Sequence, residues 1–217
     1  MSAGDLEAFK HAAAEAAAEA VSDGMRVGLG TGSTVAHLLP ALAARGLRDL
    51  RCVATSIATA EKAAALGLPV EDFDTLDGLD VAIDGADQVA PDGWVVKGGG
   101  GAHVREKIVA AAAERFIVIA DATKIVASIA PPVPLELLAF GLPATLAALA
   151  PCAVRPGMPA SPDGNVIADY TGPVEDPAAV AAFLSSVPGV VDHGLFPPGM
   201  TAEVISAGPD GVERRLL

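Results

Sequence analysis

The chain has 217 residues, of which 52% are hydrophobic and only 4% aromatic. A chain of this length and composition buries a substantial core, as one long domain or two small ones, and intrinsic disorder is excluded. The formal net charge is −13 without any basic block, which argues against nucleic acid and anionic membranes as partners.

In the first half of the chain the predicted helices and strands alternate. The expected elements are a helix at 5–22, a strand at 25–29, a helix at 34–44, a strand at 50–54, a helix at 59–66, a strand at 79–83, a helix at 102–114 and a strand at 116–120. Such alternation predicts an α/β fold, Rossmann-like, with a mostly parallel sheet and helices on both faces. Ligands collect at the carboxyl ends of the strands in sheets of this kind.

The pattern changes after about Ile129, where Pro131–Pro134 marks a boundary and a helix is expected to follow. A strand at 165–170, a helix at 177–186 and a strand at 194–196 then predict a second, smaller α+β domain with antiparallel pairing. The uncharged stretch 137–154 is broken by Gly141 and two prolines, so we expect a short amphipathic helix there rather than a membrane span.

Localisation signals and metal motifs are not expected in this chain. The first residues include Asp5 and Glu7 without a basic segment, so we expect no signal peptide and a cytoplasmic protein. Cys52 and Cys152 lie far apart and outside any metal-like spacing, which predicts two buried thiols in a reducing compartment.

A glycine-rich turn follows the first predicted strand: Gly28-Leu29-Gly30-Thr31-Gly32-Ser33-Thr34. Backbone N–H groups at a helix N-terminus, together with short hydroxyl side chains, suit a phosphate dianion. A plain strand-to-helix turn with Thr31 or Ser33 as N-cap is the structural alternative. A nucleotide site is a rival, but it needs an acid at the end of the second strand, where this chain has Thr55-Ser56.

A cassette of charged residues and glycines begins at Asp84-Gly85-Ala86-Asp87 and ends at Lys97–Lys107. Four consecutive glycines, Gly98–Gly101, are costly in backbone entropy and make sense where the backbone lies against a ligand. Carboxylates near a lysine can have well-separated proton affinities, as acid–base chemistry requires. Taken alone, however, Asp84 and Asp87 could simply cap a turn, and Glu106 could be an exposed acid in the first turns of a helix.

These motifs, in this order, resemble the type A family of ribose-5-phosphate isomerases over nearly the whole chain. Further matching pieces are Thr55-Ser56, Asp121–Lys124 and a late segment, 188–196. The resemblance implies that the C-terminal tail rejoins the first domain. The expected domains are therefore 1–129 with 206–217, catalytic, and 130–205, small and possibly at a subunit interface.

The resemblance implies interconversion of D-ribose 5-phosphate and D-ribulose 5-phosphate through a cis-enediolate, in the non-oxidative pentose phosphate pathway. It implies no cofactor, no metal, a small sugar phosphate as the only ligand, and a homodimer or homotetramer. Glu106 would be the general base, with Asp84, Asp87 and Lys97 completing the catalytic set. The implied substrate-binding residues are Thr31, Gly32, Ser33, Thr34, Asp84, Gly85, Ala86, Asp87, Lys97, Gly98, Gly99, Gly100 and Lys124. Lys10 is a weaker candidate for the phosphate.

Two residues depart from the family pattern near these motifs: Gln88 replaces an acid, and His103 replaces a residue that is usually apolar or small. Two alternatives to the leading function stay open. One is a non-catalytic sugar-phosphate sensor on the same fold, which would bind without turnover. The other is an isomerase of a different phosphorylated sugar.

Overall fold

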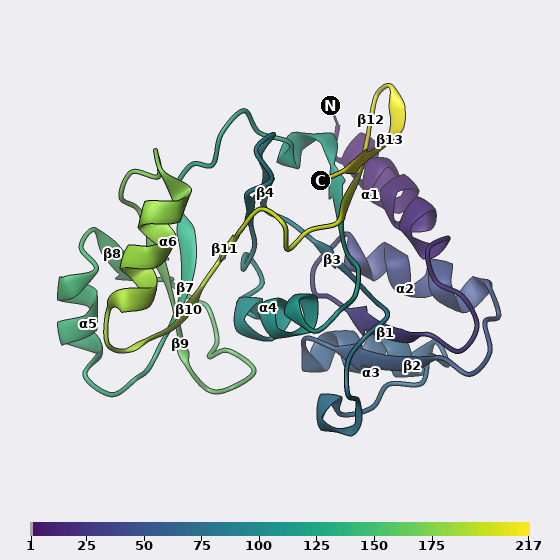
Figure 1. Cartoon of the computed structure of the whole chain (residues 1–217), viewed down its shortest axis with the longest axis horizontal. Coiled ribbons are helices and arrows are strands. Elements are labelled where there is room, and N and C mark those ends of the chain that lie inside the picture. Colours follow the sequence, from purple (N-terminus) through teal and green to yellow (C-terminus); the bar gives the residue numbers. More distant parts are fainter. Residues whose placement is uncertain (1) are drawn as a thin grey trace. The chain divides into compact units, whose positions relative to one another are not determined.

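The computed structural model describes residues 2–217, and the contacts within it divide the chain into two units (Figure 1). The first unit takes the chain up to Ala86, Arg105–Ile125 and Gly199–Leu217, and the second takes Asp87–Val104 and Val126–Pro198. The chain thus leaves the first unit directly after Ala86 and returns to it inside helix α4 (His103–Ala111).

These units differ in three places from the domains expected from the sequence, the smallest being residues 126–129, which lie in the second unit. Residues 87–104 lie in the second unit because β4 (Gln88–Val89) and β5 (Val95–Val96) form a three-stranded sheet with β11 (Leu195–Phe196). Residues 199–205 lie in the first unit because β12 (Glu203–Gly208) pairs with β6 (Phe116–Asp121). The assignment of the two parts as independent domains stays a prediction.

The first unit is built on a six-stranded sheet in the order β13-β12-β6-β3-β1-β2, in which only the β12–β13 pair is antiparallel. Its remaining elements are α1 (Ala3–Ala18), β1 (Arg26–Leu29), α2 (Val35–Ala44), β2 (Arg51–Ala54), α3 (Ile57–Ala65), the 3₁₀ turn η1 (Phe73–Thr75), β3 (Val81–Gly85), the 3₁₀ turn η2 (Ala122–Lys124) and β13 (Gly211–Leu216). The expected α/β fold, mostly parallel, is confirmed.

Helices cover both faces of this sheet. Val27 and Leu29 of β1 belong to one buried cluster with residues of α1 and α2, which lie side by side in Figure 1. Gly28, between them, faces the other way, and a Cβ built on it would lie 2.5 Å from Val109 of α4. The two-residue period of the strand therefore sends large side chains to one layer and leaves room for close helix packing in the other.

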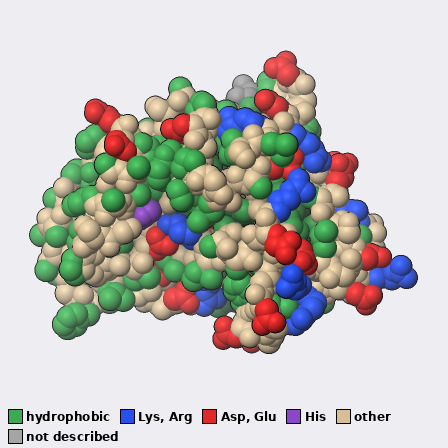
Figure 2. All heavy atoms as spheres, in the orientation of Figure 1, with side chains coloured by type: hydrophobic (Ala, Val, Ile, Leu, Met, Phe, Trp, Pro, Cys, Tyr) green, Lys and Arg blue, Asp and Glu red, His purple; other side chains and the backbone are tan. Residues whose placement is uncertain are grey.

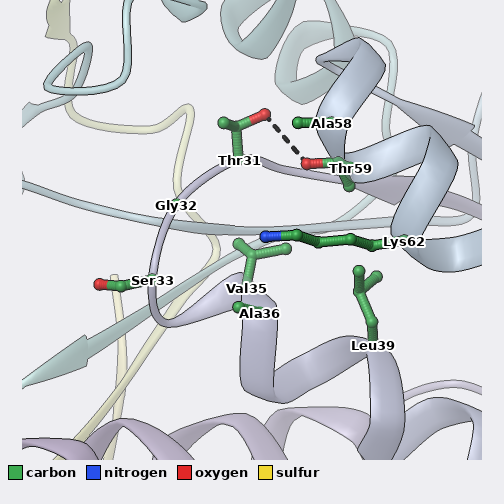
Figure 3. A pocket seen from close by; sticks show the side chains of 9 residues that line it. All are labelled: Thr31, Gly32, Ser33, Val35, Ala36, Leu39, Ala58, Thr59 and Lys62. Atoms are coloured by element: carbon green, nitrogen blue, oxygen red, sulfur yellow. Dashed lines mark hydrogen bonds between the residues drawn. The ribbon is translucent and has the colours of Figure 1, made fainter.

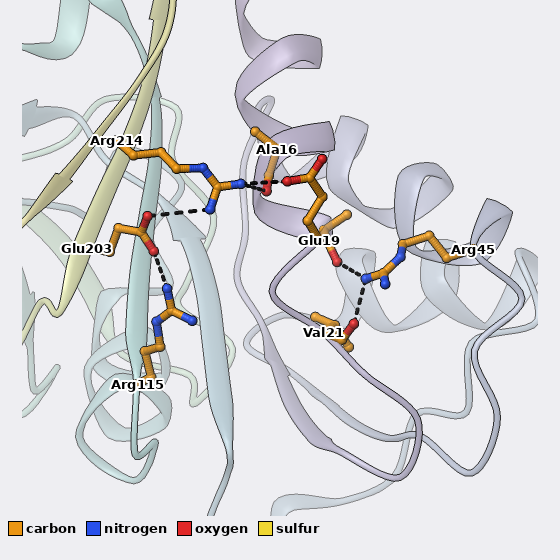
Figure 4. A network of polar contacts seen from close by, with 8 residues as sticks. Ala16, Glu19, Val21, Arg45, Arg115, Glu203 and Arg214 are labelled. Carbon is orange, nitrogen blue, oxygen red and sulfur yellow. Dashed lines mark hydrogen bonds and ion pairs between the residues drawn. The ribbon is translucent and has the colours of Figure 1, made fainter.

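The buried carboxylate of Glu203, on β12, forms ion pairs that connect the C-terminal strands to the rest of the first unit (Figure 4). It is bound by Arg115, and Arg214 Nη1 lies 3.6 Å from its other oxygen. Arg214 also donates to the carbonyl of Ala16 at 2.6 Å and to Glu19 at 2.8 Å. A buried acid of this kind is stable only with such partners.

The second unit has a four-stranded antiparallel sheet in the order β10-β7-β9-β8 and the three-stranded sheet already described. Its elements are β7 (Val133–Leu137), α5 (Leu142–Ala148), β8 (Cys152–Val154), β9 (Val166–Tyr170), α6 (Pro177–Ser186) and β10 (Val190–His193). The expected antiparallel α+β character and the helix near residues 143–150 are confirmed.

Strand β7 was not predicted: it begins inside the proline run, at Val133, and the helix expected after that run, α5, follows it. All five of its residues are buried, because β7 is flanked by β9 and β10. Pro134 has no N–H to donate, but its carbonyl still accepts from Gly194 N at 2.7 Å.

No helix within residues 2–217 is long and apolar enough to cross a membrane. On the face shown in Figure 2, Lys and Arg side chains lie interspersed with Asp and Glu. Cys52 is fully buried and Cys152 is half-buried, and burial raises the pKa of each thiol to about 11. The thiols are therefore protonated at neutral pH.

Candidate active site

The carboxylate of Asp84 is packed against the glycine turn (Gly28–Thr34) within the first unit. β1 and β3 are parallel neighbours with Leu29 opposite Ile83, so the residues that follow these two positions, Gly30 and Asp84, also lie together. Asp84 is 3% exposed, and a Cβ on Gly30 would lie 1.9 Å from its Cγ. Only glycine at position 30 leaves space for this carboxylate.

One oxygen of Asp84 holds two backbone groups. Oδ1 accepts from Thr31 N at 3.0 Å and from Gly85 N at 2.7 Å. Bonds from N–H groups to an ionised carboxylate are stronger than neutral ones. Asp84 therefore fixes the conformation of the glycine turn from the neighbouring strand.

A cluster of hydroxyl groups lies on the other side of the turn. Thr31 Oγ1 is 2.7 Å from Thr55 Oγ1 and donates to Ser56 Oγ at 2.9 Å. Thr59 Oγ1 donates to the carbonyl of Gly30 at 3.0 Å. The suggestion that Thr31 or Ser33 caps the next helix is wrong, since the N-cap of α2 is Thr34, without a side-chain bond.

A pocket of about 230 Å³ opens between the glycine turn, α2 and α3 (Figure 3). Its polar lining residues include Thr31, Ser33, Thr59 and Lys62, and Figure 3 shows the Lys62 side chain extending from α3 across the pocket toward the turn. Because one water occupies about 30 Å³ of liquid, the pocket is large enough for a phosphate group.

Lys62 is not among the residues predicted from the sequence, because a single lysine in an alanine-rich helix carries no local signal of a site. The one available signal is helical spacing: Lys62 lies three residues after Thr59 in α3, and so on the same side of that helix. The two lysines that were singled out do not line this pocket. Lys124 ends η2, half-buried, and Lys10 forms an ion pair with Glu7 at 2.7 Å.

Glu106 is located in the first turn of α4 and belongs to the first unit. Its side chain is 3% exposed, so the alternative of a solvated surface acid is excluded. A carboxylate held out of water is suited to take part in proton transfer.

The second unit contains the other half of the cassette, Asp87 and Lys97–Gly101. We call Gly98–Gly101 the glycine loop. It is a tight turn, closed by Gly101 N donating to the Gly98 carbonyl at 3.0 Å, with positive φ at Gly98 (113°) and Gly101 (72°). Gly99 N donates to Asp87 Oδ2 at 2.7 Å. The loop and the second aspartate are thus held together, as the first aspartate and the glycine turn are.

Lys97 enters this loop from the end of β5 and is 2% exposed. Its backbone N donates to Gly194 at 2.9 Å, and its ammonium lies 5.7 Å from the centre of the Phe196 ring, within range of a cation–π contact. His103 is also buried, and a Cβ on Gly98 would lie 2.8 Å from its Nδ1. His103 therefore packs against the glycine loop.

Gln88, the departure from the family's acid, has a structural partner in the second unit. Its Nε2 donates to the Ala130 carbonyl at 2.7 Å, and its Oε1 accepts from Ala130 N at 2.9 Å. A carboxylate could only accept, so the amide fits this place better than the acid does.

The predicted site residues therefore fall into two groups. Those of the first unit are Thr31, Gly32, Ser33, Thr34, Asp84, Gly85, Ala86, Glu106 and Lys124, and those of the second are Asp87, Lys97, Gly98, Gly99 and Gly100. The described residues, 2–217, contain no group of three or more His, Cys, Asp or Glu side chains placed to hold a metal ion.

Comparison with known proteins identifies similar chains. The family model for ribose 5-phosphate isomerase A (phosphoriboisomerase A) matches residues 51–211. The ribose-5-phosphate isomerase A of Nitrobacter hamburgensis is 44% identical over an alignment of 231 positions, gaps included, which covers 97% of this chain and 99% of the relative.

Two solved structures are also similar over almost their full length. Ribose 5-phosphate isomerase A from Neisseria gonorrhoeae has a TM-score of 0.92 at 32% identity, covering 97% of both chains. A D-ribose-5-phosphate isomerase in complex with phospho-erythronic acid gives the same TM-score and identity and covers 98% of this chain and 99% of its own. The similarity thus extends through both units.

Proposed function

Because the chain belongs to the ribose-5-phosphate isomerase A family, we propose that it interconverts D-ribose 5-phosphate and D-ribulose 5-phosphate. The observation that carries the mechanism is the burial of Glu106, 3% exposed, on the helix that follows the glycine loop. The reaction moves one proton between neighbouring carbons, and it needs a base that bulk water does not reach.

Glu106 acts as the general base in this mechanism. It removes the proton from C2 of the open-chain aldose, the electron pair of that bond forms the C1=C2 double bond, and the carbonyl oxygen on C1 becomes an enediolate oxygen. A proton passes between the two sugar oxygens, and Glu106 returns its proton to C1. The enzyme ends as it began, and no redox partner is consumed.

Lys97 and the N–H groups of Gly98 and Gly100 stabilise the charge on the enediolate oxygens, while the Gly99 N–H holds Asp87 beside them. Donors aimed at developing charge are usually the largest single contribution to such catalysis. Asp87 exchanges protons with the sugar oxygens and assists ring opening. We assign this step to Asp87 because Asp84 Oδ1 accepts from two N–H groups and so holds the glycine turn, whereas Asp87 accepts from one, that of Gly99.

The phosphate is bound at the glycine turn by Thr31, Gly32, Ser33 and Thr34. The N–H groups of Ala36 and His37 in α2 already donate to the carbonyls of Gly32 and Thr34, so the donors offered to the phosphate are those of the turn itself, and the helix dipole favours an anion there. Lys62 supplies a cation on the α3 side of the pocket. Gly85, Ala86 and Lys124 contact the sugar or its phosphate, as the family resemblance implies.

The test is isomerase activity of the purified full chain, followed as formation of the ketose from D-ribose 5-phosphate. A folded sample that forms no D-ribulose 5-phosphate overturns the proposal. Because Glu106 returns the proton that it removed, turnover in deuterated water should place much less than one deuterium per molecule on C1 of the ketose. We expect Glu106→Gln to lower kcat by at least about 100-fold, the lower range of general acid–base catalysis, with substrate binding preserved.

The alternatives give different results in the same experiment. A sugar-phosphate sensor binds ribose 5-phosphate in calorimetry but does not turn it over. An isomerase of another sugar shows a higher kcat/KM on a hexose or tetrose phosphate. Phospho-erythronic acid, which is bound in a solved relative, should inhibit this chain competitively.

We also infer a homodimer or homotetramer and a cytoplasmic location. The support for the oligomer is the family resemblance, together with Phe140, a large apolar side chain 93% exposed on the second unit. Sedimentation showing only monomer at micromolar concentration would contradict the assembly.

A further inference from the structure

Arg155, just after β8, is bound through both ends of its guanidinium group, entirely within the second unit. Its Nε and Nη2 donate to the two oxygens of Asp169 on β9, at 2.8 Å and 2.6 Å. Its Nη1 donates to two carbonyls of the glycine loop, those of Gly98 at 3.0 Å and Gly99 at 3.1 Å. Both side chains are largely buried, 18% and 21% exposed.

Asp169 makes this geometry rigid. Arg155 extends the antiparallel pairing of β8 with β9, since its N donates to the Ile167 carbonyl at 3.0 Å. Asp169 is therefore a diagonal neighbour on the adjacent strand. The parallel two-bond pairing with a carboxylate uses one side of the planar guanidinium and aims the remaining nitrogen at the loop.

The bonds from Arg155 determine where the loop's N–H groups point. In a trans peptide the C=O and the following N–H point in opposite directions. When the carbonyls of Gly98 and Gly99 turn toward Arg155, the N–H groups of Gly99 and Gly100 must turn away from it. The bond from Gly99 N to Asp87 at 2.7 Å fits this orientation.

The positive charge of Arg155 also acts on these peptide groups. The bonded Asp169, and the negative charge of Asp87 nearby, raise the pKa of Arg155 above its ordinary value, so the group stays cationic. A cation on a carbonyl oxygen polarises the whole peptide and makes its N–H a stronger donor.

We propose that Arg155 is a positioning residue for catalysis: anchored by Asp169, it orients and polarises the Gly100 N–H, which stabilises the enediolate, and the Gly99 N–H, which holds Asp87 in place. Arg155 itself contacts only the loop carbonyls and Asp169. This assignment rests on the proposed isomerase function. A positioning role for Arg155 predicts an effect on the chemical step, whereas a purely structural role would change only the stability of the second unit.

The experiment compares Arg155→Met, Arg155→Lys and Asp169→Asn with a matched control, Arg26→Met. Arg26 forms a similar two-bond pair with Asp80 in the first unit, at 2.6 Å and 3.2 Å, and has no part in the site. We expect Arg155→Met to lower kcat by about 10- to 100-fold while KM changes less than about threefold. N–H donors that no longer point at the enediolate oxygens weaken binding of the transition state more than binding of the substrate.

The conservative variant separates geometry from charge. Arg155→Lys keeps the charge but cannot bond Asp169 and two carbonyls at once, so it should recover only part of kcat. Asp169→Asn should lower kcat in the same direction and by less. Arg26→Met should leave kcat and KM unchanged.

A second readout does not depend on activity. Amide hydrogen exchange at Gly99 and Gly100, measured by NMR, should be at least about tenfold faster in Arg155→Met and unchanged in Arg26→Met. If wild-type enzyme is active and Arg155→Met keeps its kcat, or loses it without faster exchange in the loop, the inference is overturned.

Two further outcomes are also informative. If the wild-type chain does not isomerise ribose 5-phosphate, the proposed function fails, while the exchange data still decide whether Arg155 orders the loop. If Arg155→Met does not fold, Arg155→Lys and Asp169→Asn provide the same two readouts.

Discussion

Replacing Gly30 with alanine should separate Asp84 from the glycine turn. The new Cβ would lie 1.9 Å from Asp84 Cγ and 2.0 Å from Oδ1. The alanine cannot relieve this overlap, because its Cβ position is fixed by the backbone. Asp84 must therefore swing away and lose its bonds from Thr31 N and Gly85 N. At about 1.5–3 kcal/mol for each bond to a charged group, we expect the free energy of unfolding to fall by about 3–6 kcal/mol.

Urea unfolding followed by circular dichroism measures this loss, and activity with ribose 5-phosphate should fall with it. Gly78→Ala is the matched control, because its Cβ would meet only the Ala112 carbonyl, at 3.5 Å. We expect the control to change stability by less than about 1 kcal/mol.

A double-mutant cycle with Asp84→Gly identifies the cause. Asp84→Ala would not serve, since the Asp84 Cβ itself lies 2.5 Å from the new methyl position. In the Asp84→Gly background, Gly30→Ala should cost at least about 2 kcal/mol less than in the wild type. Equal costs in both backgrounds would refute the steric explanation.

Two further predictions concern polar pairs. Gln88→Glu removes the donor to the Ala130 carbonyl and should lower the free energy of unfolding by about 1–3 kcal/mol at neutral pH. The loss should be smaller near pH 4, because the protonated acid can donate again. An unchanged urea midpoint would contradict this. Arg51, and to a smaller extent the Thr75 hydroxyl, lower the pKa of Glu71 from 4.5 to about 2, so these contacts stabilise the fold above pH 4.5 and lose this contribution as the pH falls toward 2. Arg51→Met should flatten the pH dependence of the unfolding free energy in that window, and equal slopes for both proteins would count against it.

The parallel sheet was predictable because its strands are short apolar runs separated by helical segments. β6, buried along its whole length, reads directly as a central strand. The placement of Asp84 at a strand end was also predictable, but its contact with Gly30 was not. That contact depends on the register between β1 and β3, which no local pattern specifies.

The remaining differences have similar physical causes. Pro134 suggested a break, whereas the strand that contains it is stabilised by neighbours on both sides. Arg155 lies 57 residues from Gly98, and nothing in the local sequence joins them. Lys62 could not be predicted as a site residue, because the pocket wall opposite it comes from another segment of the chain.

The position of β12 has a consequence for the biosynthesis of this protein. The strand lies between β6 and β13, yet it begins only at Glu203. Until the ribosome has released those final residues, a nascent chain presents β6 with a bare row of peptide groups beside an apolar core. A chain that ends before residue 203 would therefore leave this edge of β6 uncovered, and we expect such a fragment to self-associate through it.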